Sequence, residues 1–211
     1  MKGYFRNSDF DIFNIDGLDE RMSAIREQIQ PVFQHIGDAY IADVNAYTEF
    51  EGSFHIAQHR RRTTNAPEST WSAIGGNKRG YKKYPHIQIG INEKHIFMFL
   101  SLIDNPKHEI TMGEYLLKRR SLWDNLNDDY FVSGDHTKPD IQSAEEDTVE
   151  KTLKRLINVK KGEFMVGRVL IPSSDELNDD SKQKEFFEDT LNGLLPMYKE
   201  LLDLYQKEEM K

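Results

Sequence analysis

The sequence contains no cysteine among its 211 residues. Disulfide bonds and thiolate metal sites are therefore excluded, and such a chain suits a reducing compartment. Long apolar runs are also missing, since the longest, residues 96–103, falls far short of the roughly 20 residues that span a bilayer. The start of the chain carries charge with no apolar run behind it, which is not the pattern of a signal peptide. We expect a soluble, cytoplasmic protein that does not enter a membrane.

Positive charge is scarce overall, because 28 lysine and arginine residues face 36 acidic residues and the net charge is −8. It is concentrated in residues 55–90, hereafter the basic segment, which holds seven lysine or arginine residues and a single acid, Glu68. An acidic protein attracts little nucleic acid through its total charge, so an anionic partner must be met locally. This segment also holds three histidines, Trp71 and Tyr81, and is the strongest functional signal in the sequence.

Alternating apolar and polar residues predict several strands. Residues 84–91 alternate isoleucines with polar residues or glycine, which predicts a strand buried on one face. Residues 95–103 are apolar on both faces, as in a strand in the middle of a sheet. The short connection between these two strands makes them antiparallel. Further strands are predicted at residues 10–15, 50–57, 70–75, 130–133 and 164–171.

Apolar residues spaced three and four apart predict helices around these strands. The first covers residues 22–44, and Pro31 inside it predicts a kink or a break because proline cannot donate its backbone hydrogen bond. A helix over residues 106–126 is expected to turn Ile110 inward. Residues 143–146, SAEE, match a capping box that would start another helix, and a final helix runs from Ser181.

No repeat or long linker divides the chain, so we predict one domain over residues 1–211. The clustered strands, with helices before and after them, predict an α+β fold, an antiparallel sheet with helices packed on one face.

Four blocks of the sequence resemble, in order, those of the YktB-like family of bacterial proteins. They are HIAQHRRRTTNAPESTW, NKRGYKKYPHIQIG, SGDHTKP and VKKGEF, and the match runs from NSDFDIFNIDGLDERM to the last helix. The resemblance implies a TBP-like arrangement, in which a curved antiparallel sheet grips the helices. The family has no established function, so no catalytic or binding residue carries over. Residues 65–67 read Asn-Ala-Pro where the family has asparagine and two prolines, which loosens the loop without removing a chemical group.

His55 and His59 have the spacing of two zinc-binding histidines on a helix. Zinc metalloprotease motifs place a glutamate directly after the first histidine, and Ile56 stands there instead. On a strand, four residues separate the two side chains by about 13 Å. We therefore interpret them as hydrogen-bonding histidines at a strand edge, and we predict neither a metal nor a cofactor.

The glycine-rich residues 75–80, GGNKRG, lack P-loop spacing and precede a strand, so a hairpin turn explains them as well as a phosphate site does. The basic segment as a whole is a stronger signal, because arginine binds oxyanions with two hydrogen bonds and aromatic faces stack on bases. Its cations could instead pair with the acidic helices. The ligand-binding residues predicted are Arg61, Trp71, Lys78, Arg79, Tyr81, Lys82, Lys83, His86 and Lys138.

Residues 135–139, DHTKP, place an acid, an imidazole and an amine in one loop, hereafter the DHTKP loop. A carboxylate beside a histidine can orient and charge it for acid–base catalysis. The sequence shows no nucleophile elbow, and an ordered turn ahead of a helix is the alternative interpretation. The weak catalytic candidates are His136, Asp135 and His86.

Three functions are compatible with these signals. The leading hypothesis is a binding protein that takes a phosphorylated small molecule or a single-stranded nucleic acid on a basic and aromatic surface. The second is a metal-independent hydrolase or transferase with a His/Asp/Lys site, and the third is a protein-interaction module with an acidic partner. Histidines around one deep pocket would favour the enzyme. An open basic sheet face would favour binding of nucleic acid, and a flat apolar patch rimmed by lysines would favour the interaction module.

The two polar regions are expected to meet. We predict that the DHTKP loop and residues 79–86, RGYKKYPH, lie together, with His136 and Lys138 near Arg79 and His86. Like charges gathered in one region repel, so such an arrangement indicates an anionic ligand that offsets them.

Overall fold

The computed structural model describes residues 3–124, 126 and 128–211. In this part of the chain, seven strands form one open sheet in the order β1-β2-β3-β4-β7-β5-β6, and every neighbouring pair is antiparallel. The strands are β1 (Ser53–Ile56), β2 (Ser69–Gly75), β3 (His86–Asn92), β4 (Ile96–Leu102), β5 (Tyr130–Ser133), β6 (Gln142–Ser143) and β7 (Phe164–Leu170).

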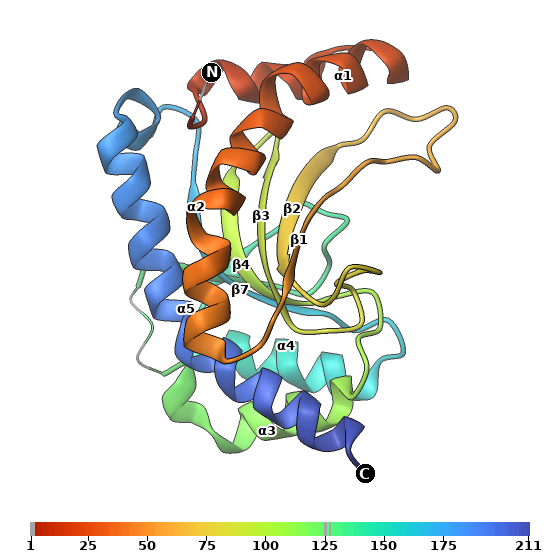
Figure 1. The fold of residues 1–211 in the computed structure, drawn as a ribbon, viewed down its shortest axis with the longest axis vertical. Helices are drawn as coiled ribbons and strands as arrows, with labels where there is room; N and C mark the ends of the chain where they lie inside the picture. The colour runs from red at the N-terminus through yellow and green to blue at the C-terminus, as the bar shows by residue number, and fades with distance from the viewer. Residues whose placement is uncertain (1–2, 125, 127) are drawn as a thin grey trace.

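The main helices are α1 (Leu18–Ala24), α2 (Gln30–Thr48), α3 (Glu109–Lys118), α4 (Glu146–Asn158) and α5 (Asp180–Glu209). Of these, α2, α4 and α5 pack against one face of the sheet, whereas α1 and α3 pack mainly on other helical segments (Figure 1). Where a kink or a break was predicted at Pro31, the five-residue π-helix η2 (Ile25–Ile29) joins α1 to α2 just before the proline within one continuous helical run, so the helix is irregular there but not broken. One hydrophobic cluster joins the helices to Ile87, Ile89 and Ile91 of β3 and to Met98, Leu100 and Leu102 of β4. The predicted α+β fold is confirmed, while the TBP-like arrangement and the single-domain organisation stay predictions.

The opposite face of the sheet carries a smaller apolar cluster of Phe97, Phe99, Ile103 and Met165. Ile141, from the loop between β5 and β6, packs against it. Both faces of β4 are therefore buried, as its sequence predicted. The expectation that β3 is buried on one face only was wrong, because its polar positions are buried as well. Loops cover the face that no helix covers.

Residues 10–15 do not form the predicted strand. They belong to the 3-10 helix η1 (Asn7–Asn14), where the Asp9 carboxylate accepts a hydrogen bond of 2.7 Å from the backbone N–H of Arg6. Three-residue spacing then turns Phe10 and Phe13 into the core. The local hydrogen bond at the helix start outweighs a short alternating pattern.

Two helix predictions were wrong in detail. Ser143 lies in β6 and pairs with Phe131, so it does not form a capping box for α4. Ile110 is 51% exposed, because α3 turns Met112 and Leu116 inward instead. This helix also ends before residue 126, and the short 3-10 helix η3 (Arg120–Leu122) follows it.

None of the helices in the described ranges combines the length and apolar character that crossing a bilayer requires.

A substitution at Gly167 of β7 tests how tightly the centre of the sheet is packed. A Cβ atom at this position would overlap the Met98 carbonyl oxygen and crowd the Phe99 ring. We expect Gly167→Ala to lower the free energy of unfolding by about 2–3 kcal/mol, because the backbone atoms of β4 cannot move aside cheaply. Urea denaturation measures this value.

Gly134→Ala is the matched control, because its Cβ would find no heavy atom closer than 3.5 Å. This variant should stay within about 0.5 kcal/mol of the original protein. Equal losses in the two variants would contradict the packing described for β7.

Candidate functional site

Trp71 and Tyr81 form the centre of a polar group on the sheet face that the helices leave free. The Trp71 Nε1–H donates a hydrogen bond of 2.7 Å to the Tyr81 hydroxyl. Four imidazoles contact this pair. The four histidines together with Trp71 and Tyr81 are hereafter called the histidine group. His55 and His86 lie against Tyr81, with ring centroids 5.3 and 4.8 Å away, and His59 and His136 lie against Trp71 at 5.6 and 5.9 Å. The DHTKP loop and the basic segment therefore meet in the folded chain.

His86 is fully buried, and its Nδ1 lies 3.0 Å from the Tyr84 carbonyl oxygen. Its Nε2 has no hydrogen-bond partner among the described residues, and neither does the Nε2 of His55. Burial lowers the pKa of His86 to about 4, and the charges of Lys82 and His136 act in the same direction. The imidazole is therefore neutral at pH 7, chiefly because it is desolvated rather than because cations surround it.

His59 is held in the same uncharged state. Burial and the charge of Arg62 lower its pKa to about 4, and its Nε2 lies 3.1 Å from the Thr70 hydroxyl. Burial also lowers the pKa of His55. The expectation of hydrogen-bonding histidines thus describes both residues, because His55 bonds the backbone of Asn77 and also lies against the Tyr81 ring.

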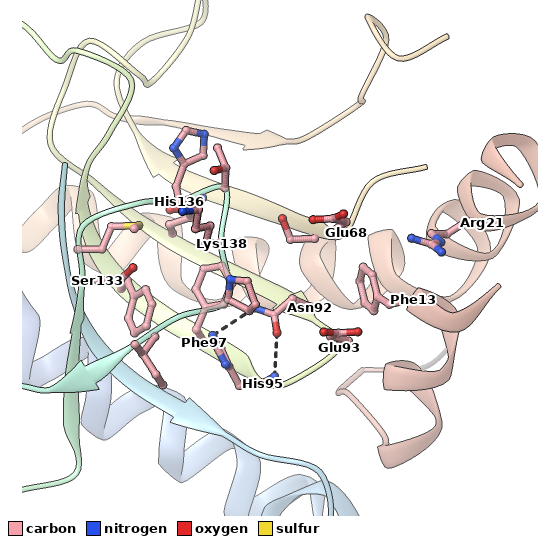
Figure 2. A pocket seen from close by; sticks show the side chains of 17 residues that line it. Phe13, Arg21, Glu68, Asn92, Glu93, His95, Phe97, Ser133, His136 and Lys138 are labelled. Carbon is pink, nitrogen blue, oxygen red and sulfur yellow. Dashed lines mark hydrogen bonds between the residues drawn. The ribbon is translucent and has the colours of Figure 1, made fainter. Parts of the chain in front are cut away.

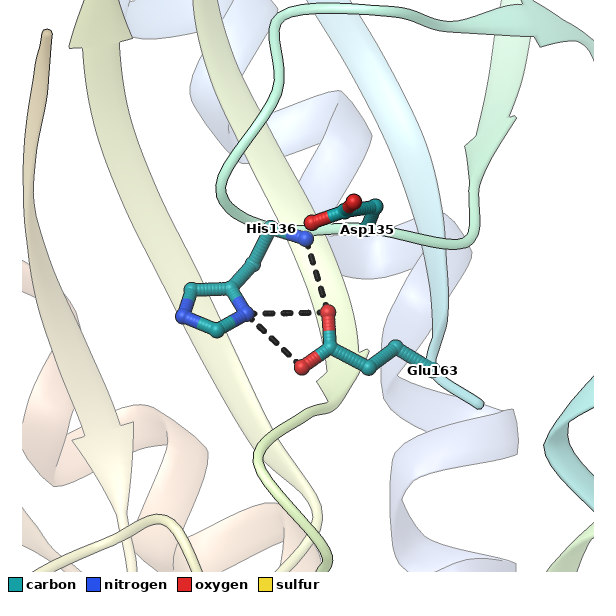
Figure 3. A group of neighbouring side chains, drawn as sticks. All are labelled: Asp135, His136 and Glu163. Carbon is teal, nitrogen blue, oxygen red and sulfur yellow. Dashed lines mark hydrogen bonds and ion pairs between the residues drawn. The ribbon is translucent and has the colours of Figure 1, made fainter. Parts of the chain in front are cut away.

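His136 has a buried carboxylate partner, Glu163. The His136 Nδ1 lies 2.7 and 2.9 Å from the two oxygens of Glu163, and the backbone N–H of His136 donates to Oε2 at 2.7 Å. The backbone N–H of Asp104 donates to Oε1 at 2.9 Å. Figure 3 shows the second ring nitrogen, Nε2, on the side of the ring away from Glu163. No hydrogen bond in the described part of the chain occupies that nitrogen.

Strand register explains why these two residues meet. β5 pairs with β7, with Ser133 opposite Met165. The chain leaves β5 toward residue 136 at the end where Glu163 enters β7, so the two side chains arrive at the same edge. Glu163 carries no pattern that marks it as functional in the sequence. Only this register identifies it.

Asp135 does not orient the imidazole, although it precedes it in sequence. Its Oδ1 accepts hydrogen bonds from the Thr137 backbone N–H at 3.0 Å and hydroxyl at 2.6 Å. Partial burial opposes ionisation, but these bonds and the charges of Lys138 and His136 outweigh it and lower the pKa of Asp135. The carboxylate closes the turn that presents His136.

Donor atoms of Asp135, His136 and Glu163 lie within 4.8 Å of one another, close enough to hold a metal ion. Each of these groups is already engaged by the chain, because Glu163 accepts from two backbone N–H groups and Asp135 accepts from Thr137. Hydrogen bonds thus account for the arrangement without a cation.

Asp104, whose backbone N–H bonds Glu163, also pairs with a cation of the basic segment. Lys82 Nζ lies 2.7 Å from its carboxylate. The pKa of Asp104 is lowered first by that hydrogen bond and, despite partial burial, also by the charges of Lys82, His136 and Arg61. Lys82 therefore pairs directly with this carboxylate, and the charges of His136 and Arg61 also act on it. Lys138 is exposed, with Nζ 3.9 Å from Asp135 Oδ2.

Three predicted binding residues, Lys78, Arg79 and Lys83, are exposed on segments whose neighbouring residues contact the histidine group. Lys78 and Arg79 are exposed at a hairpin turn that the Asn77–Gly80 bridge closes. Lys83 is also exposed. Within the described ranges, no hydrogen bond or ion pair joins the side chains of these three residues to His136 or Tyr81. The glycine-rich segment is a turn, as one interpretation of the sequence held.

A pocket of about 320 Å³ opens beside His136 on the same face (Figure 2). His136 and Lys138 lie at one end of it, and Arg21, Glu68 and Glu93 lie at the other. Its sheet side is formed by Phe97, Phe99, Met165, Gln88 and Ser133.

Several polar groups of the pocket are held in place. Gln88 accepts a hydrogen bond of 3.0 Å from the buried hydroxyl of Ser101. Arg21 donates to the carbonyls of Ile15 and Pro67 at 2.9 and 3.0 Å, so its guanidinium braces the loops. No sequence pattern selects Gln88 or Ser133, because their positions in the pocket follow from the pairing of neighbouring strands.

Fold and site define an α+β protein with an open antiparallel sheet and a histidine-flanked pocket on its helix-free face. Residues 5–198 match the family described as "Domain of unknown function (DUF1054)". A UPF0637 protein of Enterococcus faecalis is 44% identical over 194 residues, covering 92% of this chain and 96% of the relative. One from Lactococcus lactis subsp. cremoris is 43% identical over 201 residues, covering 95% and 100%. The chain belongs to this family, and the resemblance to YktB-like bacterial proteins is confirmed.

Burial of neutral His86 should make stability depend on pH. An unfolded histidine titrates near pH ~6.5, whereas His86 in the folded chain has a pKa of about 4. Between these values the unfolded state binds more protons, so the stability present at pH 7 is lost as the pH falls. We expect His86→Gln to reduce the loss between pH 7 and 5 by about 2 kcal/mol.

Urea denaturation at both pH values measures this difference. His35→Gln is the control, because it makes the same substitution at an exposed histidine of α2. A variant at residue 86 with the full original pH dependence would show that the folded protein protonates His86 freely.

Proposed function

We propose that this protein binds a phosphorylated small molecule in the pocket beside His136, in the cytoplasm. The observation that supports this most is the placement of His136 and Lys138 together at one end of the pocket. Lys138 is loosely paired, at 3.9 Å from Asp135, and can turn to an anion at little cost.

The opposite end of the pocket selects the remainder of the ligand. Glu68 and Glu93 line it and are exposed. Carboxylates accept hydrogen bonds and repel a second phosphate, so this end favours amino or hydroxyl groups. The ligand that fits is anionic at one end and a hydrogen-bond donor at the other.

The aromatic floor favours a planar or apolar body between these ends. Phe97 and Phe99 stack with centroids 4.9 Å apart and an interplanar angle of 24°. Met165 borders them, while Gln88 and Ser133 supply polar atoms. A phosphorylated ring compound matches the order of these surfaces along the pocket, which runs from the His136 and Lys138 end over the apolar floor to the acidic end.

A single-stranded nucleic acid fits less well. Such ligands need cations along a groove and open stacking faces. Here the acids at one end of the pocket oppose a continuous phosphate backbone. In the described ranges, the side chains of Lys78, Arg79 and Lys83 also make no hydrogen bond or ion pair with His136 or Tyr81.

An interaction module is not favoured either, because the exposed large apolar side chains of the described residues come from separate segments. These side chains are Tyr47, Ile110, Val159, Ile171 and Met210.

The clustered histidines favour a second candidate function, a hydrolase or transferase that acts on the same ligand.

Thermal shift with matched ligand pairs tests the proposal. The probes are AMP, pyridoxal 5′-phosphate and ribose 5-phosphate, each beside its unphosphorylated counterpart, together with a twelve-nucleotide oligo(dT). We expect at least one phosphorylated compound to raise the melting temperature, because a ligand of the folded state stabilises it. Its counterpart should bind at least tenfold more weakly.

Lys138→Gln should weaken the binding phosphorylated probe about tenfold, the loss expected for one charge-assisted hydrogen bond. Lys151→Gln removes an exposed cation of α4 and should leave the affinity unchanged. Equal shifts within each pair, or no shift at all, would overturn the proposal. Stabilisation by oligo(dT) alone would favour nucleic acid instead.

A further inference from the structure

We propose that the pocket is catalytic and that it hydrolyses a phosphate ester, with His136 as the general base and Glu163 as its positioning residue. This inference rests on the proposed function, which supplies the phosphorylated ligand. It adds a reaction, a water substrate and a residue, Glu163, that the sequence did not single out.

The Glu163 carboxylate selects the tautomer of His136. A carboxylate only accepts hydrogen bonds, so the Nδ1 that faces it at 2.7 and 2.9 Å must carry the proton. The Nε2 is then the basic nitrogen, and it lies on the side of the ring away from Glu163 (Figure 3). This is how a buried acid orients a catalytic imidazole in known acid–base sites.

The dyad is held rigidly, as proton transfer requires. Glu163 is 7% exposed, and its two oxygens accept backbone N–H groups from Asp104 and His136 as well as the imidazole. The Trp71 ring meets the His136 ring edge to face, at 85°. Neither the carboxylate nor the ring can turn away without breaking these contacts.

His136 borders the pocket at the end where the ligand phosphate is placed. In the proposed step, a water oxygen bonds to phosphorus while one water proton passes to His136 Nε2. The ester P–O bond breaks, and its electron pair stays on the leaving oxygen, which takes a proton from bulk water. The imidazolium returns its proton to solvent, so the net reaction is ester plus water to alcohol plus phosphate.

Other groups on the molecule supported weaker inferences. His55 and His86 have unpartnered Nε2 atoms, but the Tyr81 ring lies against both imidazoles. The Asp135, His136 and Glu163 donors could hold a cation, but hydrogen bonds already account for their positions. The His136–Glu163 pair, in contrast, borders an open pocket.

Hydrolysis of p-nitrophenyl phosphate by the full chain tests the reaction. We expect release of p-nitrophenol above the buffer rate, and a drop in kcat/KM of at least ~100-fold in His136→Asn. Asparagine can still donate to Glu163 through its amide but has no basic nitrogen. The control His35→Asn changes an exposed imidazole of α2 and should keep the full rate.

A second measurement tests Glu163 without relying on activity. Long-range ¹H–¹⁵N spectra distinguish imidazole tautomers, and His136 should carry its proton on Nδ1 in the unaltered protein. In Glu163→Gln we expect a mixture of tautomers together with slower hydrolysis. A residue with a merely structural role would slow the reaction through unfolding and leave the tautomer of the folded fraction unchanged.

The outcomes separate this inference from the proposed function. Binding of phosphorylated probes without hydrolysis would overturn catalysis and leave the binding function standing, whereas neither binding nor hydrolysis would overturn both. Hydrolysis that His136→Asn leaves unchanged would place the reaction elsewhere. Activity that EDTA abolishes and Zn²⁺ restores would make the Asp135, His136 and Glu163 group a metal centre instead of a proton-transfer dyad.

Discussion

The pairing of β7 between β4 and β5 is the constraint on which both the fold and the site depend. β7 completes the hydrophobic centre of the sheet through Phe164 and Val166, which face the helices. The same strand begins at Glu163, and its register with β5 fixes where residue 136 must lie. Since a shift of one residue would turn every side chain to the other face, burial of the core also fixes the site geometry.

The buried carboxylate of Glu163 is stable because every partner it needs arrives from the backbone or the imidazole. An unpaired buried charge would cost several kcal/mol. Two backbone N–H groups and one ring nitrogen offset that cost here, and they come from the chain segments that follow β4 and β5. The loop over the sheet is thereby tied to the sheet itself.

The histidine group stabilises the protein less well than apolar side chains would. His55 and His86 each leave a buried ring nitrogen without a partner among the described residues. Such a group costs about 1–3 kcal/mol. Proteins retain unfavourable polar groups of this kind mostly at functional sites, which agrees with a pocket beside them.

The sequence by itself determined six of the seven strands of the described chain, the irregular helix before Pro31 and the burial of both faces of β4, because these follow from local periodicity and proline chemistry. It missed β6 and predicted a strand where η1 forms. It also indicated that His136 and the basic segment belong together. Only the tertiary structure decided that Glu163, and not Asp135, holds the imidazole, because that pairing depends on strand register between distant segments. Tertiary contacts likewise placed Lys82 beside Asp104 and left Lys78 and Arg79 on a turn. The number of charged residues can be counted from the sequence, but the partners that each charged side chain meets are set by the fold.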